Sequence, residues 1–112
     1  MFSSVVVKGK GEARTLGFPS VNFDIGSDVG VEPGIYAATT YIDNQTKQGA
    51  LCVWPEYNKV EMHILDFEGD LYGRTLEVDI LDKVSDFVLV SGIEAARKKI
   101  AEDVTKVRTY FA

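Results

Sequence analysis

Several residue types that carry common chemistry are scarce in this chain of 112 residues, which has one cysteine and one histidine. The single thiol, Cys52, cannot form an internal disulfide, and together with His63 it is too little for a zinc-binding cluster. We expect Cys52 to be buried in the apolar run around it, and we assign no catalytic role to His63. The absence of disulfides is typical of a reducing cytoplasm, where we place the protein.

Long apolar runs and an excess of positive charge are also missing. No segment approaches the length of about 20 apolar residues that a membrane span needs. The first four residues lack the basic region and cleavage site of a secretory signal. The formal net charge is −5, which argues against nucleic acid and anionic membranes as partners. The length allows a single domain, residues 1–112, and we expect a monomer.

Short β-type runs separated by turn residues make up most of the chain. The runs lie at residues 5–7, 20–25, 35–42, 49–54, 59–67 and 75–84, with turns at 43–44 and 68–70 and a loop at 26–34. Because no helix separates these runs, their order favours an antiparallel six-stranded barrel over a parallel sheet.

The C-terminal segment has a different periodicity. Ser91 and Glu94 have the spacing of a capping box at a helix N-terminus. Apolar residues then recur at steps of three and four, at Ile93, Ala96, Ile100, Val104, Val107 and Phe111. This pattern predicts a helix of about 20 residues whose apolar face packs on the barrel and seals an open end or edge.

The most specific pattern is the run Thr-Leu-Gly-Phe-Pro-Ser-Val-Asn at residues 15–22. Gly17 allows a tight turn, and Pro19 fixes φ. Ser20 and Asn22 are one residue apart, so in a strand their side-chain oxygens face the same way. A hydroxyl and an amide at one place suit a magnesium ion that carries the phosphates of a nucleotide. The same two residues also suit a turn that bonds its own backbone.

A segment rich in glycine and positive charge leads into this run. Gly9 and Gly11 can let the loop close over phosphates, or they can simply end the first strand. Lys8, Lys10 and Arg14 provide the local positive charge that an acidic protein needs to bind an anionic nucleotide. Arg14 equally suits a solvated loop.

These residues resemble the hallmark of the riboflavin kinase (flavokinase) family, which reads approximately G-x-G-x-G-[KR]-x-L-G-x-P-T-A-N. Ser20 stands at the threonine and keeps its hydroxyl, Val21 stands at the alanine, and Asn22 is retained. Glu12 or Ala13 replaces the third glycine of the loop. The resemblance covers nearly the whole chain and implies a mainly β fold, a six-stranded antiparallel Greek-key barrel with a C-terminal helix.

A second segment, Val-Glu-Met-His-Ile-Leu-Asp at residues 60–66, also resembles the family, as does the Tyr-Gly pair at 72–73. By this resemblance, Glu61 is the general base that accepts a proton from the ribityl 5′-hydroxyl of riboflavin. Periodicity alone would make Glu61 a solvated strand residue. The resemblance implies that Tyr72 contacts the nucleotide, although an aromatic residue beside a turn glycine is commonly structural.

The chain departs from the family after the last strand, where the family carries a pattern like L-R-x-E-x-x-F. Ser85 stands at the arginine and Phe87 at the glutamate. A hydroxyl cannot replace the charge, reach and stacking surface of a guanidinium group. Phe87 is therefore our candidate for holding the flavin by stacking. Trp54 and Tyr57 suit an adenine pocket and ordinary packing equally well.

The resemblance implies a Mg²⁺-dependent enzyme that transfers the γ-phosphate of ATP to the 5′-hydroxyl of riboflavin, giving FMN and ADP. Ser20 and Asn22 are then the metal ligands, and Gly9, Gly11, Arg14 and Tyr72 join them in binding the nucleotide. We expect no conversion of FMN to FAD, because no nucleotidyltransferase domain precedes the barrel. The absent arginine leaves two alternatives open: a non-catalytic flavin- or nucleotide-binding regulatory module, and a small barrel that binds another protein.

Overall fold

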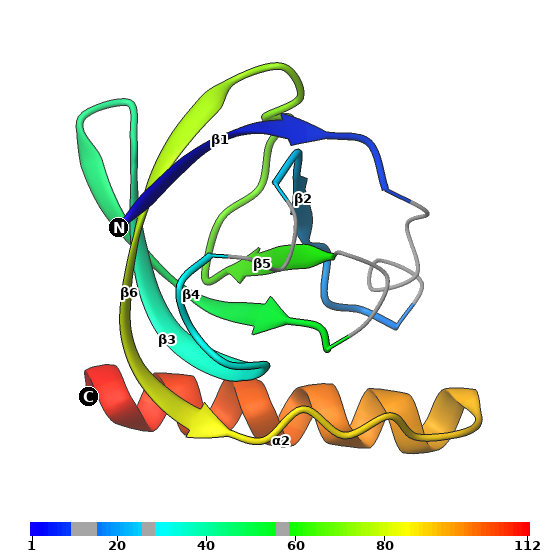
Figure 1. Ribbon diagram of the computed structural model, residues 1–112. Coiled ribbons are helices and arrows are strands. Elements are labelled where there is room, and N and C mark those ends of the chain that lie inside the picture. The colour runs from blue at the N-terminus through cyan, green and yellow to red at the C-terminus, as the bar shows by residue number, and fades with distance from the viewer. Residues whose placement is uncertain (10–15, 26–28, 56–58) are drawn as a thin grey trace.

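The structure, a computed structural model, describes residues 1–9, 16–25, 29–55 and 59–112. Within these residues six strands form a closed barrel in which every neighbouring pair is antiparallel (Figure 1). The helix, α2 (Ile93–Phe111), follows the last strand. In sheet order the strands are β1 (Phe2–Val7), β2 (Val21–Phe23), β5 (Val60–Ile64), β4 (Gln45–Val53), β3 (Gly34–Ile42) and β6 (Thr75–Ser85), and β6 pairs with β1.

The connections between strands follow a Greek key. β3, β4 and β5 are consecutive neighbours, and β6 returns to lie beside β3. The turn between β3 and β4 is formed by Asp43 and Asn44, whose φ values are 49° and 66°. Two residues with positive φ make the tight turn that matches strand twist, and short polar residues tolerate it. The predicted fold class and this predicted turn are confirmed.

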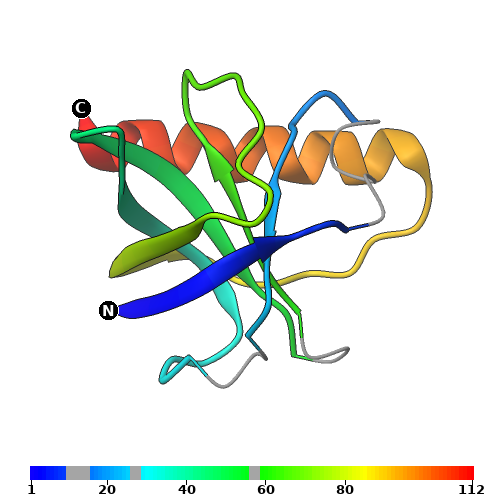
Figure 2. The ribbon, with the colours of Figure 1, turned by 90° about the horizontal axis from the view of Figure 1, so that it is seen from above.

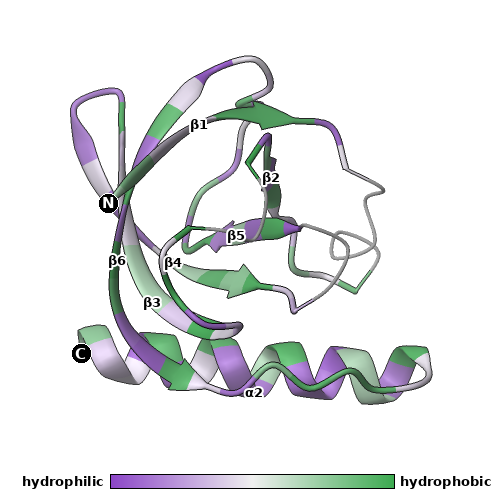
Figure 3. Ribbon diagram, viewed as in Figure 1, coloured by the Kyte–Doolittle hydropathy of each residue, from purple (hydrophilic) through white to green (hydrophobic). Residues whose placement is uncertain are grey.

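Alternation along the strands separates the barrel core from its outer face. In β5, Val60, Met62 and Ile64 are buried, whereas Glu61 and His63 are partly exposed. Figure 3 shows the same mixture of apolar and polar residues along β5 and α2. The inward residues pack into one apolar cluster with contributions from all six of the strands described. The ionisable side chains of β5, Glu61 and His63, therefore point out of the barrel.

The helix α2 lies along the outside of the barrel, as Figures 1 and 2 show. Its buried residues Val104 and Val107 pack against Ile35 of β3, Ala50 of β4 and Leu65, in an apolar cluster separate from the barrel core. Apolar side chains on the outward face of β3 and β4 make this packing possible. The predicted packing of the helix on the barrel is confirmed, but the helix covers an outer face of a closed barrel and seals neither an open end nor an edge.

The start of α2 also differs from the expectation. Gly92 is the N-cap and makes no side-chain cap hydrogen bond, so the capping box predicted at Ser91 is not formed. Glu94 instead accepts a hydrogen bond from Arg97 at 2.8 Å. Ile93 is 63% exposed and lies outside the apolar face. Across the described part of the chain, no helix has both the length and the apolar character that crossing a membrane requires.

The observed strand boundaries differ from the predicted ones where pairing extends a strand over residues that have no strand pattern of their own. β1 begins at Phe2, and β4 begins at Gln45, because its polar first half pairs with the end of β3. The segment predicted at 20–25 contains only the three residues of β2. β5 ends at Ile64, since Asp66 adopts a φ of 54°, which breaks the extended backbone.

Candidate active site

Three neighbouring strands bring Asn22, Glu61 and Cys52 into one row on the outer face of the barrel. Asn22 of β2 pairs directly with Glu61 of β5, and Glu61 pairs on its other side with Cys52 of β4. Opposite residues in antiparallel strands have Cβ atoms about 4.5–5.5 Å apart. Backbone pairing alone therefore places a carboxylate between an amide and a thiol.

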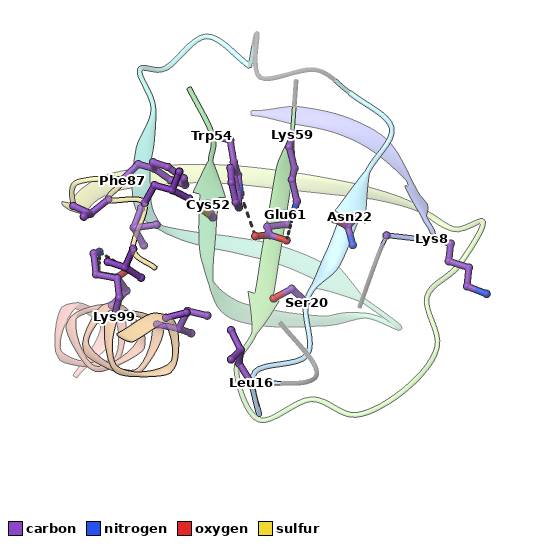
Figure 4. A pocket seen from close by; sticks show the side chains of 18 of the residues that line it. Lys8, Leu16, Ser20, Asn22, Cys52, Trp54, Lys59, Glu61, Phe87 and Lys99 are labelled. Carbon is purple, nitrogen blue, oxygen red and sulfur yellow. Dashed lines mark hydrogen bonds and ion pairs between the residues drawn. The ribbon is translucent and has the colours of Figure 1, made fainter. Parts of the chain in front are cut away.

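A cavity of about 430 Å³ lies over this row and extends to the helix (Figure 4). This volume is in the usual range for small-molecule sites, about 300–1,000 Å³. The cavity has two sides, which we name by their supports. The barrel wall consists of Ser20, Asn22, Cys52, Trp54 and Glu61, and the helix wall consists of residues 87–90 with Lys99 and Ile100 of α2.

The Glu61 carboxylate is held by contacts to both of its oxygens. Trp54 Nε1 donates a hydrogen bond to Oε1 at 3.2 Å, and Lys59 Nζ lies 3.7 Å from Oε2. The Lys59 ammonium also sits 4.4 Å from the centre of the Trp54 ring, as a cation–π contact. Figure 4 shows these three side chains converging on the barrel wall. The carboxylate thus has a fixed orientation beside the cavity.

The segment that carries Ser20 is fixed to β5 through His63. Nδ1 of His63 donates to the Pro19 carbonyl at 2.7 Å, since a carbonyl only accepts, and the Phe18 ring packs edge-on against the imidazole. Gly17 adopts a φ of 91°, so the predicted glycine turn is confirmed. The Ser20 hydroxyl donates to the Phe18 carbonyl at 3.1 Å. Its proton is used locally, and its oxygen lone pairs remain able to bind a cation.

Gly9 lies unusually close to Asn22. A Cβ at position 9 would be 2.1 Å from Nδ2 of Asn22, so only glycine fits against that amide. Asn22 is thereby confined between the Gly9 backbone and its partner Glu61. Lys8 lines the same cavity but is exposed, and in Figure 4 its side chain points away from Glu61.

Phe87 contributes to the helix wall and reaches across to the barrel wall. Its ring centre is 4.7 Å from that of Trp54, with a tilt of 52° between the planes. The exposed side chains of Val88 and Leu89 continue the wall beyond Phe87. Tyr72 is 53% exposed at the cavity, and the Asp70 carboxylate accepts a hydrogen bond from the Tyr72 backbone nitrogen at 2.9 Å.

All described residues predicted for the site line this one cavity, although their roles stay predictions. They are Gly9, Ser20, Asn22, Glu61, Tyr72 and Phe87. The other residues named for the site or its surroundings, which lie outside the described residues, are Lys10, Gly11, Arg14 and Tyr57.

Lys59, Lys99 and Cys52 are among the lining residues that the sequence reasoning missed. Lys59 is two residues before Glu61, and strand alternation would have placed both on one face. Lys99 gave no such signal. Cys52 was expected in the core but is only partly buried, because it points outward to the cavity. Burial raises the pKa of its thiol far above the usual value, and the Glu61 carboxylate adds to this rise, so the thiol stays protonated.

Comparison with known proteins agrees with this architecture. The family model for Flavokinase, described as riboflavin kinase, matches residues 1–111. The RNA-binding riboflavin kinase RibR of Bacillus subtilis is 28% identical over 99% of this chain and 51% of its own length. A bifunctional riboflavin kinase/FMN adenylyltransferase of Mycoplasma pneumoniae is 31% identical over 96% of this chain and 41% of its own length.

A solved structure has the same fold. A protein titled as a macrolide-efflux protein, from Streptococcus pneumoniae, superimposes with a TM-score of 0.79 over 95% of this chain and 37% of its own, at 24% identity. This chain thus has the closed barrel with a C-terminal helix found in that protein. It belongs to the riboflavin kinase family, because the family model matches almost its whole length. It spans about half or less of the length of the curated relatives described above.

Proposed function

We propose that this chain is a riboflavin kinase that transfers the γ-phosphate of ATP to the ribityl 5′-hydroxyl of riboflavin. The observation that carries the proposal is the direct pairing of Asn22 with Glu61 at a cavity of ligand size. This pairing sets a candidate base beside candidate phosphate and metal ligands. Membership of the riboflavin kinase family supports the choice of flavin as acceptor.

In this mechanism Glu61 accepts the proton of the 5′-hydroxyl as the hydroxyl oxygen bonds to the γ-phosphorus. The bond between that phosphorus and the bridging oxygen breaks, and ADP leaves with the bond's electron pair. General base catalysis of this kind contributes about 10²–10⁴ in rate. The contacts from Trp54 and Lys59 orient the carboxylate before the substrate binds. Preorganisation and positioning supply the larger share in phosphoryl transfer.

The donor atoms on the barrel wall fit a magnesium ion. Hydroxyl and amide oxygens are hard ligands, and Mg²⁺ usually takes only one or two protein ligands together with phosphates and water. Ser20 keeps its lone pairs because its proton is bonded to a backbone carbonyl. Ser20 and Asn22 would hold the ion, which when bound neutralises charge on the phosphates. Gly9 supports Asn22, and Tyr72 is proposed as a contact for the nucleotide.

Phe87 is proposed as the flavin contact. An aromatic ring that packs at a tilt against Trp54 at the cavity presents the apolar surface that an isoalloxazine ring system needs. The proposal also includes a cytoplasmic location, a monomeric chain and no nucleic-acid partner. The last point rests on the net charge of −5. A filter-binding titration with RNA tests it, and saturable binding at physiological salt would contradict it.

The decisive experiment measures FMN formation by chromatography after incubation with riboflavin, ATP and Mg²⁺. Glu61→Gln keeps the shape of the side chain and removes its basicity, so we expect turnover to fall about 10²–10⁴-fold with an unchanged circular dichroism spectrum. Glu68→Gln, at an exposed loop position, is the matched control and should turn over normally. Equal turnover in Glu61→Gln and the unaltered chain would falsify the role of Glu61.

A second function is favoured by one observation. Ser85 and Phe87 stand where the family pattern has an arginine and a glutamate. A chain that has lost these groups can retain the cavity and bind flavin or nucleotide without turnover, as a regulatory module. Quenching of Trp54 fluorescence by riboflavin in the absence of any FMN formation would favour this module over the kinase.

A further inference from the structure

Lys99 is an unusual lysine because its ammonium group is directed into the protein. The group donates to both carboxylate oxygens of Asp103 at 2.6 Å, to the Asp86 carbonyl at 3.1 Å and to Ser85 Oγ at 3.3 Å. The side chains of Lys99 and Asp103 are only 19% and 8% exposed. A charge pair this shielded needs several hydrogen bonds to offset its loss of water.

The number of N–H donors on the Lys99 ammonium group limits how many partners it can bind. An ammonium group has three N–H donors, and Asp103, Asp86 and Ser85 supply three accepting residues. Little donor capacity is left for a ligand. Lys99 therefore acts as a tie between α2 and the end of β6, and it does not serve as a cation for phosphate.

This tie sits directly beside the aromatic contact of the helix wall. The carbonyl that Lys99 binds belongs to Asp86, and the next residue, Phe87, packs against Trp54. Trp54 in turn donates to the Glu61 carboxylate. A continuous set of contacts thus runs from a helix lysine to the candidate base. Residues 86–90 have no helix or strand pairing of their own, so side-chain ties of this kind fix their position.

We propose that Lys99, through its ion pair with Asp103, is a positioning residue that holds the 86–90 segment in place for flavin binding. Its ammonium group places a positive charge from the helix within hydrogen-bond reach of Ser85, whose own side chain is an uncharged hydroxyl. The inference rests on the proposed function for the identity of the ligand. The placement of the segment can be measured without any turnover.

The test compares Lys99→Met with Lys98→Met, a matched change at the exposed neighbouring position. Loss of a positioning contact typically reduces binding or activity about 10–100-fold. We expect Lys99→Met to raise KM for riboflavin by that factor, with KM for ATP within about twofold and kcat little changed. Lys99→Arg should recover most of the loss, because it keeps the charge and the Asp103 pair. An unchanged KM for riboflavin overturns the proposal.

Two further measurements do not depend on catalysis. Backbone amides of residues 86–90 should exchange hydrogen about tenfold faster in Lys99→Met, because the segment opens more often. Trp54, the only tryptophan in the chain, should show red-shifted emission as Phe87 leaves its ring. Normal exchange and normal emission in Lys99→Met overturn the proposal.

Removal of one partner from a buried ion pair can unfold a small protein, so a second variant is needed. Lys99→Met combined with Asp103→Leu removes both charges and leaves no unpaired one, which is often neutral for stability. The double variant should fold and still show the raised KM for riboflavin, and a normal KM in it overturns the proposal. If the unaltered chain binds riboflavin without turnover, only the kinase assignment fails, whereas no binding of riboflavin overturns both.

Discussion

The two walls of the cavity are built in different ways. The barrel wall is set by backbone pairing, since Asn22, Glu61 and Cys52 lie opposite one another in three adjacent strands. The helix wall is a segment without regular structure, held to α2 by the side chain of Lys99. Strand register, which the hydrophobic pattern and the turns determine, therefore fixes the positions of Asn22, Glu61 and Cys52. The helix wall depends on individual side chains, and there the chain departs from the family pattern.

This contrast predicts that the two walls have different roles, one in phosphoryl transfer and the other in flavin binding. The proposed metal and phosphate ligands and the proposed base lie on the barrel wall, where small errors in position would be most harmful to transfer. The proposed flavin contact, Phe87, lies on the helix wall, whose position is set by fewer restraints. Changes to the barrel wall should therefore affect turnover, and changes to the helix wall should affect riboflavin affinity.

After Glu61→Gln, the largest effect is expected for Asn22→Ala on the barrel wall. Removing one preorganised polar group at a site of charge development costs about 10²–10³ in kcat. The loss should be partly recovered at high Mg²⁺, because the variant has lost a proposed metal ligand. Activity measured across a Mg²⁺ titration checks this, with exposed Gln45→Ala as the control. A normal response to Mg²⁺ in Asn22→Ala would remove Asn22 from the metal site.

A smaller loss of activity is expected for Gly9→Ala, because Gly9 contacts the side-chain amide of Asn22. The added Cβ would overlap Nδ2 of Asn22 and displace the side chain. We expect kcat to fall about 10–100-fold, with riboflavin binding unchanged. The double variant Gly9→Ala/Asn22→Ala should be no worse than Asn22→Ala alone, since both changes act through one group. Additive losses would show that Gly9 acts elsewhere.

Much of the barrel wall could be predicted from the sequence. Alternation along residues 60–64 assigns Glu61 and His63 to one face, and the spacing of Ser20 and Asn22 brings both to one place. What the sequence does not contain is the pairing of Asn22 with Glu61, because register between distant strands depends on the whole barrel. The resemblance to the family, and not periodicity, singled out Glu61 as a base.

The helix wall was far less predictable. Residues 86–90 have neither a strand nor a helix period, and only the folded chain places Phe87 against Trp54. Lys99 and Asp103 have a visible helical spacing, yet their burial depends on where α2 docks. The capping box failed for a related reason. Gly92 occupies the cap, so Ser91 lies one residue too early to bond the first turn.

The docking of α2 can be weakened without touching either wall. Val107 of α2 is fully buried against the barrel, so Val107→Ala should lower the free energy of unfolding by about 1.5–3 kcal/mol. Ile93→Ala is the matched control, because Ile93 belongs to the same sequence stripe but is 63% exposed. Its effect should stay within about 0.5 kcal/mol. Urea unfolding followed by circular dichroism measures both, and equal values would contradict the docking seen here.

The smallest effect concerns the tie between α2 and the turn after β5. Arg108 donates to both Asp66 oxygens at 3.0 and 3.3 Å, and this hydrogen bonding, with the positive charge, lowers the pKa of the Asp66 carboxyl below its ordinary 3.8. A carboxyl whose pKa is lower in the folded than in the unfolded protein stabilises the fold at pH values above its ordinary pKa. This stabilisation disappears as the pH falls through the folded-state pKa.

Arg108→Gln should therefore lower Tm slightly at pH 7, and this difference should disappear as the pH falls through the folded-state pKa of Asp66, because the carboxyl then becomes protonated in both states. Because both side chains are exposed, high salt should reduce the difference at pH 7 as well. Thermal melts over a series of pH values from 7 into acid, with and without salt, check this. A Tm difference that persisted in acid would mean that Arg108 stabilises the helix by packing and not by its ion pair with Asp66.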